Sequence, residues 1–153
     1  MIEKLDNQNI DISKKIRSIF QVSYAIEAKI LDAIDFPPLK RNLEDFLICK
    51  NDFFGFWKNE EIAAVIEIKN NEHFTHLQSL VVDPKYFRQG LAQQLISFVL
   101  HHFDSETFIV ETGVANEPAL KLYEKFGFKE IKQWDTEHGI RKIRFEWKPE
   151  SSI

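Results

Sequence analysis

Cysteine is nearly absent from this sequence, which has Cys49 alone among 153 residues. A single cysteine cannot form a disulfide within the chain, and it cannot supply the cysteine pair of a structural zinc site. No apolar run approaches the roughly 18 residues that a membrane-spanning helix needs. Residues 1–9 mix charges with few apolar side chains, unlike a signal peptide. These absences predict a cytoplasmic protein with no membrane partner.

Positive charge is not in excess either. The chain has 20 lysine and arginine residues against 24 aspartate and glutamate residues, a formal net charge of −4. A nucleic-acid-binding protein is expected to have a basic stripe or a high isoelectric point, so we expect no nucleic-acid partner. The histidines are badly spaced for a metal, because His73 and His76 would face opposite sides of a strand and His101 adjoins His102 on a helix. We therefore expect no metal.

What the chain does contain is enough apolar material for one core. Hydrophobic residues make up 44% of the sequence, and 14 of the residues are phenylalanine. This content is too high for a disordered chain. The sequence has no internal repeat and no long Gly/Ser linker. Length and composition together predict one domain over residues 1–153.

The spacing of apolar residues changes along the chain and predicts its secondary structure. Residues 10–33 have helical spacing, which Pro37 and Pro38 interrupt because proline lacks an amide hydrogen. The other predicted elements are helices at 43–49, 91–103 and 116–127, and strands at 52–58, 62–69, 74–82, 107–111, 128–134 and 140–147. The third of these strands is apolar on both faces towards its end, which predicts a central position in the sheet. The order of elements indicates a mixed α/β domain.

A glycine-bearing turn follows that third strand. Val82 ends the strand, Pro84 sets the turn, and a helix opens near Gly90. A helix N-terminus has unpaired amide hydrogens and a partial positive charge, and these bind phosphate groups. Gly90 and Ala92 are small enough for a pyrophosphate to approach the backbone, and Arg88 can add a charged contact. Taken alone, the glycine is explained better by a turn that only starts a structural helix.

A second segment, residues 116–128, also follows a strand. It reads Asn-x-x-Ala-x-x-Leu-Tyr, with Gly-Phe at its end, and so contains Asn116, Tyr123 and Gly127. Together with the turn at residues 87–92, it resembles the GCN5-related N-acetyltransferase (GNAT) superfamily. The resemblance covers residues 53–147. The sequence departs from the family's turn at Phe87, where the family has glutamine or arginine.

The resemblance implies a three-layer α/β fold, in which helices cover both faces of a mixed sheet of six to seven strands. It also implies acetyl-CoA as co-substrate, held where two parallel strands splay apart. In this register Leu80 to Val82 pair with the pantetheine arm, and Asn116 contacts the coenzyme, although asparagine is equally suited to cap the helix. The implied coenzyme-binding residues are Leu80, Val81, Val82, Arg88, Gln89, Gly90, Leu91, Ala92, Gln93, Asn116 and Tyr123.

The implied general acid is Tyr123, whose phenol would protonate the departing thiolate. The general base stays open. The family's usual position for it is Gln78, an amide that cannot usefully accept a proton. Glu67 or His76 acting through water are alternatives, and direct attack by an already neutral amine is another. In the N-terminal part, Phe36 and Arg41 are candidates for contact with the acceptor, or parts of a loop that stops a helix.

The predicted function is acetyl transfer from acetyl-CoA to a primary amine of a small molecule or a protein, by direct attack in a ternary complex. The alternative is a coenzyme A-binding sensor or interaction module without transferase activity, which the amide at Gln78 keeps open. The resemblance also allows a homodimer.

Overall fold

The computed structural model describes residues 1–149. Its strands are β1 (Ile2–Leu5), β2 (Asp52–Lys58), β3 (Glu61–Asn70), β4 (Phe74–Val82), β5 (Thr107–Gly113), β6 (Lys129–Asp135) and β7 (Arg141–Trp147). Its helices are α1 (Ile10–Ile30), α2 (Leu43–Ile48), α3 (Leu91–His102) and α4 (Glu117–Lys125), with 3₁₀ turns η1 (Pro37–Lys40) and η2 (Pro84–Tyr86).

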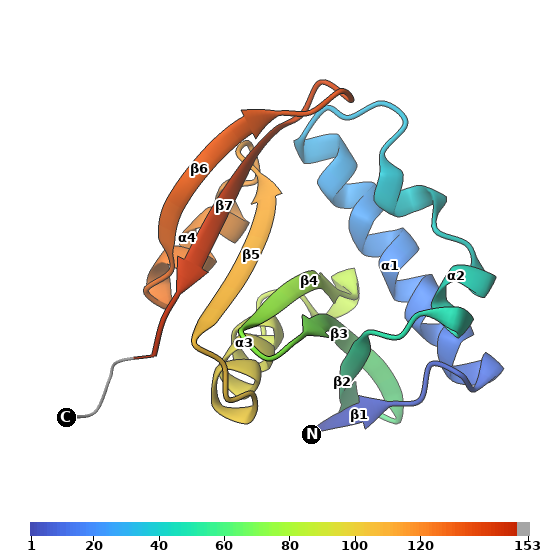
Figure 1. Ribbon diagram of the computed structural model, residues 1–153. Helices are drawn as coiled ribbons and strands as arrows, with labels where there is room; N and C mark the ends of the chain where they lie inside the picture. The colour runs from blue at the N-terminus through green and yellow to red at the C-terminus, as the bar shows by residue number, and fades with distance from the viewer. Residues whose placement is uncertain (150–153) are drawn as a thin grey trace.

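The strands form one mixed sheet in the order β1-β2-β3-β4-β5-β7-β6. Only β4 and β5 pair in parallel, and the other neighbours are antiparallel. Helices α3 and α4 lie on one side of the sheet, while α1 and α2 lie on the other (Figure 1). The predicted three-layer α/β fold and the central position of β4 are therefore confirmed.

Each face of the sheet has its own buried cluster, because successive side chains of a strand point to opposite faces. Phe53 and Val65 pack with Ile16 and Phe20 of α1. On the other face, Phe54, Ala64 and Ile66 pack with side chains of α3. Strand β3 is buried continuously from Ile62 to Ile68, which explains why it is a nearly continuous apolar run in the sequence.

Two predictions about the N-terminal part were inaccurate. Residues 2–5 form β1, which pairs with β2, although their sequence has no strand-like pattern. Helix α1 ends at Ile30 rather than at Ala33, because the chain turns sharply at Asp32 and Asp35, both of which have positive φ. A four-residue edge strand is specified by its partner strand more than by its own side chains.

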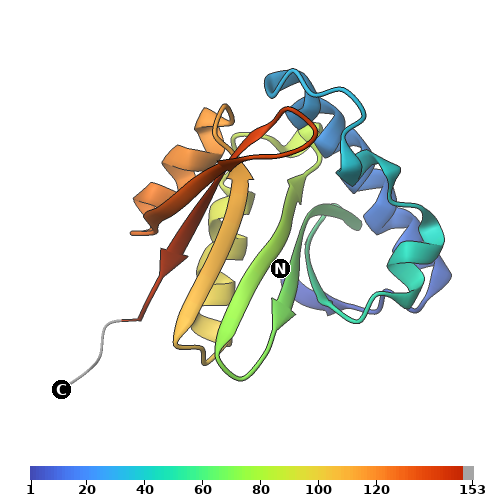
Figure 2. The same cartoon turned by 45° about the horizontal axis from the view of Figure 1, so that its top comes forward.

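The feature that places the site is the separation of β4 from β5. Their ladder ends at the pair Leu77–Val110, whereas β4 continues to Val82 and β5 to Gly113. Figure 2 shows the two strands close together at one end and diverging towards the other. The β3–β4 register also shifts here, because Glu67 pairs with Ser79 and Ile68 with Leu77. Gln78 is thus the extra residue of a β-bulge, which increases the local twist.

None of the helices within residues 1–149 is both long enough and apolar enough to cross a membrane.

Candidate active site

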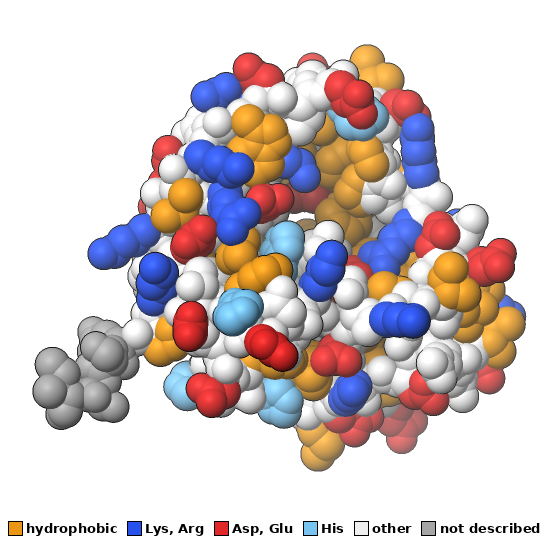
Figure 3. All heavy atoms as spheres, in the orientation of Figure 1, with side chains coloured by type: hydrophobic (Ala, Val, Ile, Leu, Met, Phe, Trp, Pro, Cys, Tyr) orange, Lys and Arg blue, Asp and Glu red, His pale blue; other side chains and the backbone are white. Residues whose placement is uncertain are grey.

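A cleft of about 680 Å³ opens between the diverging ends of β4 and β5. Figure 3 shows a hollow in the surface whose walls carry hydrophobic side chains. We call the part formed by the end of β4, residues 87–93 and α4 the coenzyme side. We call the part formed by α1, η1 and the β6–β7 hairpin the acceptor side. The two sides meet at the free end of β5, near Gly113.

The coenzyme side has a run of six backbone amides that lack protein acceptors. Arg88 and Gly90 have positive φ values of 64° and 75°, so the chain turns tightly before α3 starts at Leu91. Within residues 1–149, no backbone or side-chain group accepts a hydrogen bond from the amides of residues 88–93. Unpaired amides at a helix N-terminus form an anion site. A Cβ at Gly90 would meet no atom within 4 Å, which leaves the approach to these amides open.

The two glutamine side chains of this turn accept hydrogen bonds from lysines of β2 and α4. Gln89 accepts from Lys58, and Gln93 accepts from Lys125 at 3.2 Å. Phe87 lines the cleft and is 44% exposed, so the position that is polar in the family presents an aromatic ring here. Any anion bound at this turn would be held chiefly by backbone amides.

Asn116 is the N-cap of α4, as its sequence position allowed. Its Oδ1 accepts from the Ala119 amide at 3.4 Å. Its Nδ2 donates to Glu27 Oε1 at 2.8 Å, although the two residues lie 89 positions apart. This hydrogen bond joins the start of α4 to α1 across the cleft. Asn116 therefore connects the coenzyme side to the acceptor side.

Tyr123 lines the cleft from α4 and is only 5% exposed. Its ring packs edge-to-face on Phe128, with the ring centroids 5.6 Å apart. Burial raises the pKa of the Tyr123 phenol above its ordinary value, and the nearby Tyr24 and Glu27 raise it further. The phenol consequently keeps its proton at neutral pH, as a general acid must.

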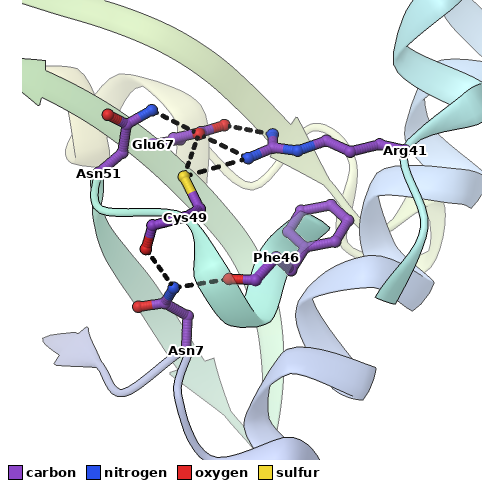
Figure 4. Close-up of polar contacts among 6 residues, drawn as sticks. All are labelled: Asn7, Arg41, Phe46, Cys49, Asn51 and Glu67. Carbon is purple, nitrogen blue, oxygen red and sulfur yellow. Dashed lines mark hydrogen bonds and ion pairs between the residues drawn. The ribbon is translucent and has the colours of Figure 1, made fainter. Parts of the chain in front are cut away.

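Glu67, one of the candidate bases, is 1% exposed and fully engaged by its neighbours. Arg41 Nη1 donates to its Oε1 at 2.7 Å and Arg41 Nη2 to its Oε2 at 2.9 Å, while Asn51 Nδ2 donates at 2.8 Å (Figure 4). Burial alone would raise the pKa of Glu67, but Arg41, Asn51 and Ser79 hold it below its ordinary value. A carboxylate in this state is a weak base.

The same network fixes the loop that contains Arg41. The guanidinium lies 4.3 Å from the centre of the Phe46 ring, and Arg41 Nη2 lies 3.4 Å from Cys49 Sγ. Asn7 Nδ2 donates to the carbonyl oxygens of Phe46 and Cys49, which ties α2 to the segment after β1 (Figure 4). Arg41 lines the cleft, but its charge is already paired within the protein.

Of the other predicted site residues, some line the cleft and some do not. Gln78, Leu80, Val82 and Ala92 line the cleft. His76 does not belong to the cleft-lining residues of the described chain, and burial lowers the pKa of its imidazole. Val81 is buried against the other face of the sheet, under α1 and α2.

Phe36 lines the acceptor side but is only 7% exposed. It packs with Ala28 and Ile140, so the tip of the β6–β7 hairpin rests on the end of α1. The close approach of α1 to the sheet also depends on Gly113, where a Cβ would lie 2.5 Å from Leu31 Cδ2. The acceptor side is therefore roofed by segments far apart in the sequence.

The prediction from sequence missed Glu27, Tyr24, Glu111 and Lys142, which also line the cleft. Glu27 had a detectable signal. It follows Phe20 by seven residues, two helical turns, and so falls on the buried face of α1. A charged residue on such a face calls for a functional or structural explanation.

The structure thus brings together two diverging strands, helix-start amides without a protein acceptor among residues 1–149, and a buried phenol that lines the cleft. A family model for the acetyltransferase (GNAT) domain matches residues 39–149. The chain belongs to the GNAT acetyltransferase family.

The chain is also similar to individual bacterial proteins. The UPF0157 protein YqkA of Bacillus subtilis is 29% identical over 154 residues, which cover 100% of this chain and 45% of that protein. The chain thus spans less than half of the length of YqkA. A second Bacillus subtilis relative, the uncharacterized N-acetyltransferase YsnE, is 29% identical over 83 residues, which cover 50% of this chain and 55% of that protein.

Two solved structures share the fold. The ribosomal-protein-S18-alanine N-acetyltransferase from Escherichia coli has a TM-score of 0.77 at 21% identity, covering 100% of this chain and 96% of that one. The PaiA N-acetyltransferase from Thermoplasma acidophilum, in complex with coenzyme A, has a TM-score of 0.74 at 16% identity, covering 97% and 99%.

Proposed function

We propose that this chain transfers an acetyl group from acetyl-CoA to a primary amine, by direct attack in a ternary complex. The observation that carries the proposal is the coenzyme side of the cleft. There the end of β4 has no β5 partner beyond Leu77, and six free amides lie at residues 88–93. A linear pantetheine arm matches the unpaired strand edge, and a pyrophosphate matches the amides.

For the donor, we assign the pantetheine arm to the backbone of residues 80–82 and the pyrophosphate to the amides of residues 88–93. Asn116 and Tyr123 lie further along the same cleft, next to the place where the thioester would arrive. The existence of a related fold in complex with coenzyme A supports this choice of donor.

For the chemistry, we assign the general acid to Tyr123. The amine nitrogen bonds to the thioester carbon, the carbon–sulfur bond breaks, and the leaving thiolate takes the phenolic proton. The position of Tyr123 supports this role, because its phenol lines the same cleft as the end of β4 and carries its proton at neutral pH.

For the acceptor, we propose a primary amine on a small molecule or on a protein. A protein α-amino group is the first acceptor to test, because one protein with this fold is named a ribosomal-protein-S18-alanine N-acetyltransferase. Since the curated relatives extend well beyond this chain, their further segments can influence acceptor choice. Cytoplasmic location and homodimer formation stay predictions.

The test combines binding and turnover on one sample. Saturating acetyl-CoA should raise the melting temperature, because a ligand at 100 times its Kd stabilises the folded state by about 2.7 kcal/mol. ATP, which has phosphates but no pantetheine, should give a much smaller shift. Free thiol should then appear when amines are added, and mass spectrometry should find the acetylated amine.

Three results contradict parts of the proposal. No thermal shift with acetyl-CoA would remove the coenzyme site. A shift without thiol release, over peptides and small amines alike, would favour the coenzyme-binding module that does not transfer. Thiol release without an acetylated amine would indicate hydrolysis.

A further inference from the structure

The carboxylate of Glu27 occupies the point where the two sides of the cleft meet. It projects from α1 and accepts from Asn116 Nδ2 at 2.8 Å, at the start of α4. Thr112, at the free end of β5, lines the same cleft and opposes the rise in the pKa of Glu27. These residues belong to the elements that border the splayed strands, so Glu27 lies between the predicted thioester and the acceptor side.

Charged and titratable groups reach this carboxylate from three elements. Tyr24 lies one turn earlier on α1, Tyr123 faces it from α4, and Lys142 faces it from β7. Glu111 and His138 line the same cleft. Within residues 1–149, no lysine, arginine or histidine nitrogen lies within 4 Å of the Glu27 oxygens. Glu27 is therefore a carboxylate without a direct cationic partner.

Glu67 provides the contrast. Its two oxygens receive three donated hydrogen bonds from Arg41 and Asn51, and Arg41 neutralises its charge. For Glu27, burial raises the pKa of the carboxyl, and Asn116, Lys142 and Thr112 only partly oppose that effect. A base is most effective when its pKa approaches the working pH. Of these two glutamates, the buried Glu67 and the half-buried Glu27, only Glu27 is poised to take a proton.

We propose that Glu27 is the general base of the transfer reaction. This role rests on the proposed acetyltransferase function, and Glu27 would take the proton that the amide of Gln78 cannot accept. The acceptor ammonium gives one proton to the Glu27 carboxylate, and the neutral amine attacks the thioester carbon. The new carbon–nitrogen bond forms and the carbon–sulfur bond breaks. The thiolate takes the proton of Tyr123, and the second nitrogen proton returns to that phenolate. Glu27 then releases its proton to water.

This role also defines the acceptor chemistry. A carboxylate without a direct ion pair attracts a cation, so the acceptor enters as an ammonium rather than as a neutral amine. The approach lies over the apolar roof that contains Phe36 and Ile140. Acceptors with an apolar group next to a primary ammonium should therefore be preferred over uncharged amines such as anilines.

The test is Glu27→Gln, which changes basicity and little else. The amide oxygen of glutamine still accepts from Asn116 Nδ2, so the link between α1 and α4 is kept. We expect an unchanged thermal shift with acetyl-CoA and a decrease of about 100-fold in kcat. The acid limb of the kcat–pH profile should disappear. Glu27→Asp, which keeps an acid, should retain that limb at reduced kcat.

Glu111→Gln is the matched comparison, because Glu111 is the other unassigned carboxylate in the cleft and lies 3.6 Å from Arg144. A Glu27→Gln variant that binds acetyl-CoA and keeps both its kcat and its acid limb overturns the inference while the proposed function stands. Loss of the limb in Glu111→Gln alone moves the role to Glu111 and also overturns it. A wild-type chain that transfers nothing overturns the proposed function and the inference together.

Discussion

On the coenzyme side of the cleft, the backbone groups assigned to the pantetheine arm and the pyrophosphate lie close together in the chain. Residues 80–82 and 88–93 belong to one strand, one turn and the start of one helix. On the acceptor side, the groups come from α1, η1 and the β6–β7 hairpin, and Phe36 reaches its partner Ile140 only through folding. Local sequence therefore specifies the first side, and long-range contacts specify the second.

The two sides also differ in how their polar groups are satisfied. The amides of residues 88–93 have no acceptor within residues 1–149, which suits a site filled by a ligand. On the acceptor side, Arg41, Glu67, Asn51 and Cys49 satisfy one another. Free polar groups indicate binding, whereas a closed network indicates positioning. Changes on the coenzyme side should thus affect affinity, and changes in the network should affect folding.

The largest expected effect is on stability, from Arg41→Met. Removing the guanidinium leaves Glu67, which is 1% exposed, without its cation. Breaking a buried pair in this way costs about 3 kcal/mol or more. In a chain of this size, that loss lowers the melting temperature by about 10 °C.

Two variants sharpen this prediction. The double variant Arg41→Met with Glu67→Gln should recover part of the loss, because the neutral amide can still accept from Asn51. Lys40→Met removes an exposed ion pair with Asp35 and should leave the melting temperature nearly unchanged, because water screens exposed ion pairs. If Arg41→Met were as mild as Lys40→Met, the network would not hold the acceptor side together.

The second effect is on turnover, from Tyr123→Phe. Losing the acid should lower kcat by about 100-fold, while the Kd for acetyl-CoA stays the same. Steady-state kinetics and a thermal shift measure the two quantities separately. Tyr24→Phe is the comparison, because burial also raises the pKa of Tyr24 and it faces the same cleft. A larger loss of kcat in Tyr24→Phe would move the acid from the coenzyme side to the acceptor side.

The third effect is on coenzyme affinity, from Gly90→Ala. Gly90 and Gly139 have φ values of 75° and 76°, and a Cβ at either glycine meets no atom within 4 Å. Both alanine variants should therefore lose a similar 1–2 kcal/mol, roughly, of stability. Only Gly90→Ala should also weaken acetyl-CoA binding, by about tenfold or 1.4 kcal/mol, because its methyl group crowds the pyrophosphate. Calorimetric titration with acetyl-CoA measures this, and equal Kd values for the two variants would contradict the amide site.

The smallest effect is the pH dependence of stability, which should have opposite signs for Glu27 and Glu67. The pKa of Glu27 is raised in the folded chain above its ordinary 4.5, so its contribution lowers stability as pH rises through the folded pKa. The pKa of Glu67 is lowered, so its contribution is present above pH 4.5 and is lost as pH falls through the folded pKa.

Urea unfolding at several pH values tests this difference. Glu27→Gln should be as stable as the wild type or more stable at neutral pH, by about 1 kcal/mol at most, and the gain should shrink on acidification. Glu67→Gln should be less stable at neutral pH, with a deficit that shrinks below pH 4.5. The same sign for both variants would mean that the two carboxylates do not differ as described.

The sequence predicted the central elements well because their signals are local. The period-2 pattern and the apolar run that precede Pro84 predicted β2, β3 and β4, and the helical spacing after Gly90 predicted α3. The family resemblance then placed Tyr123 and Asn116 at a coenzyme site, and both line the cleft. Strand β1 was missed because four residues at a sheet edge carry too little pattern of their own.

The acceptor side could not be predicted in the same way. Glu27 has a charged side chain on a buried helix face, which signals importance but not its partner. Its hydrogen bond to Asn116 spans 89 residues of sequence. The ion pair between Arg41 and Glu67 spans 26 residues and links a loop to a central strand. The periodic spacing of apolar residues, which predicts helices and strands, does not predict contacts between polar residues so far apart in the sequence.

By itself, the sequence determined the order of strands and helices after β1, the family resemblance and the turn at residues 87–92, because each is carried by residues that are neighbours in the chain. Only the tertiary structure decided which carboxylate is neutralised and which is free to react. Glu67 and Glu27 are the same residue type, and both are withdrawn from water. Arg41 lies against Glu67, while Asn116 donates a hydrogen bond to Glu27, which has no cationic nitrogen within 4 Å among residues 1–149, and this difference in neighbours moves their pKa values in opposite directions.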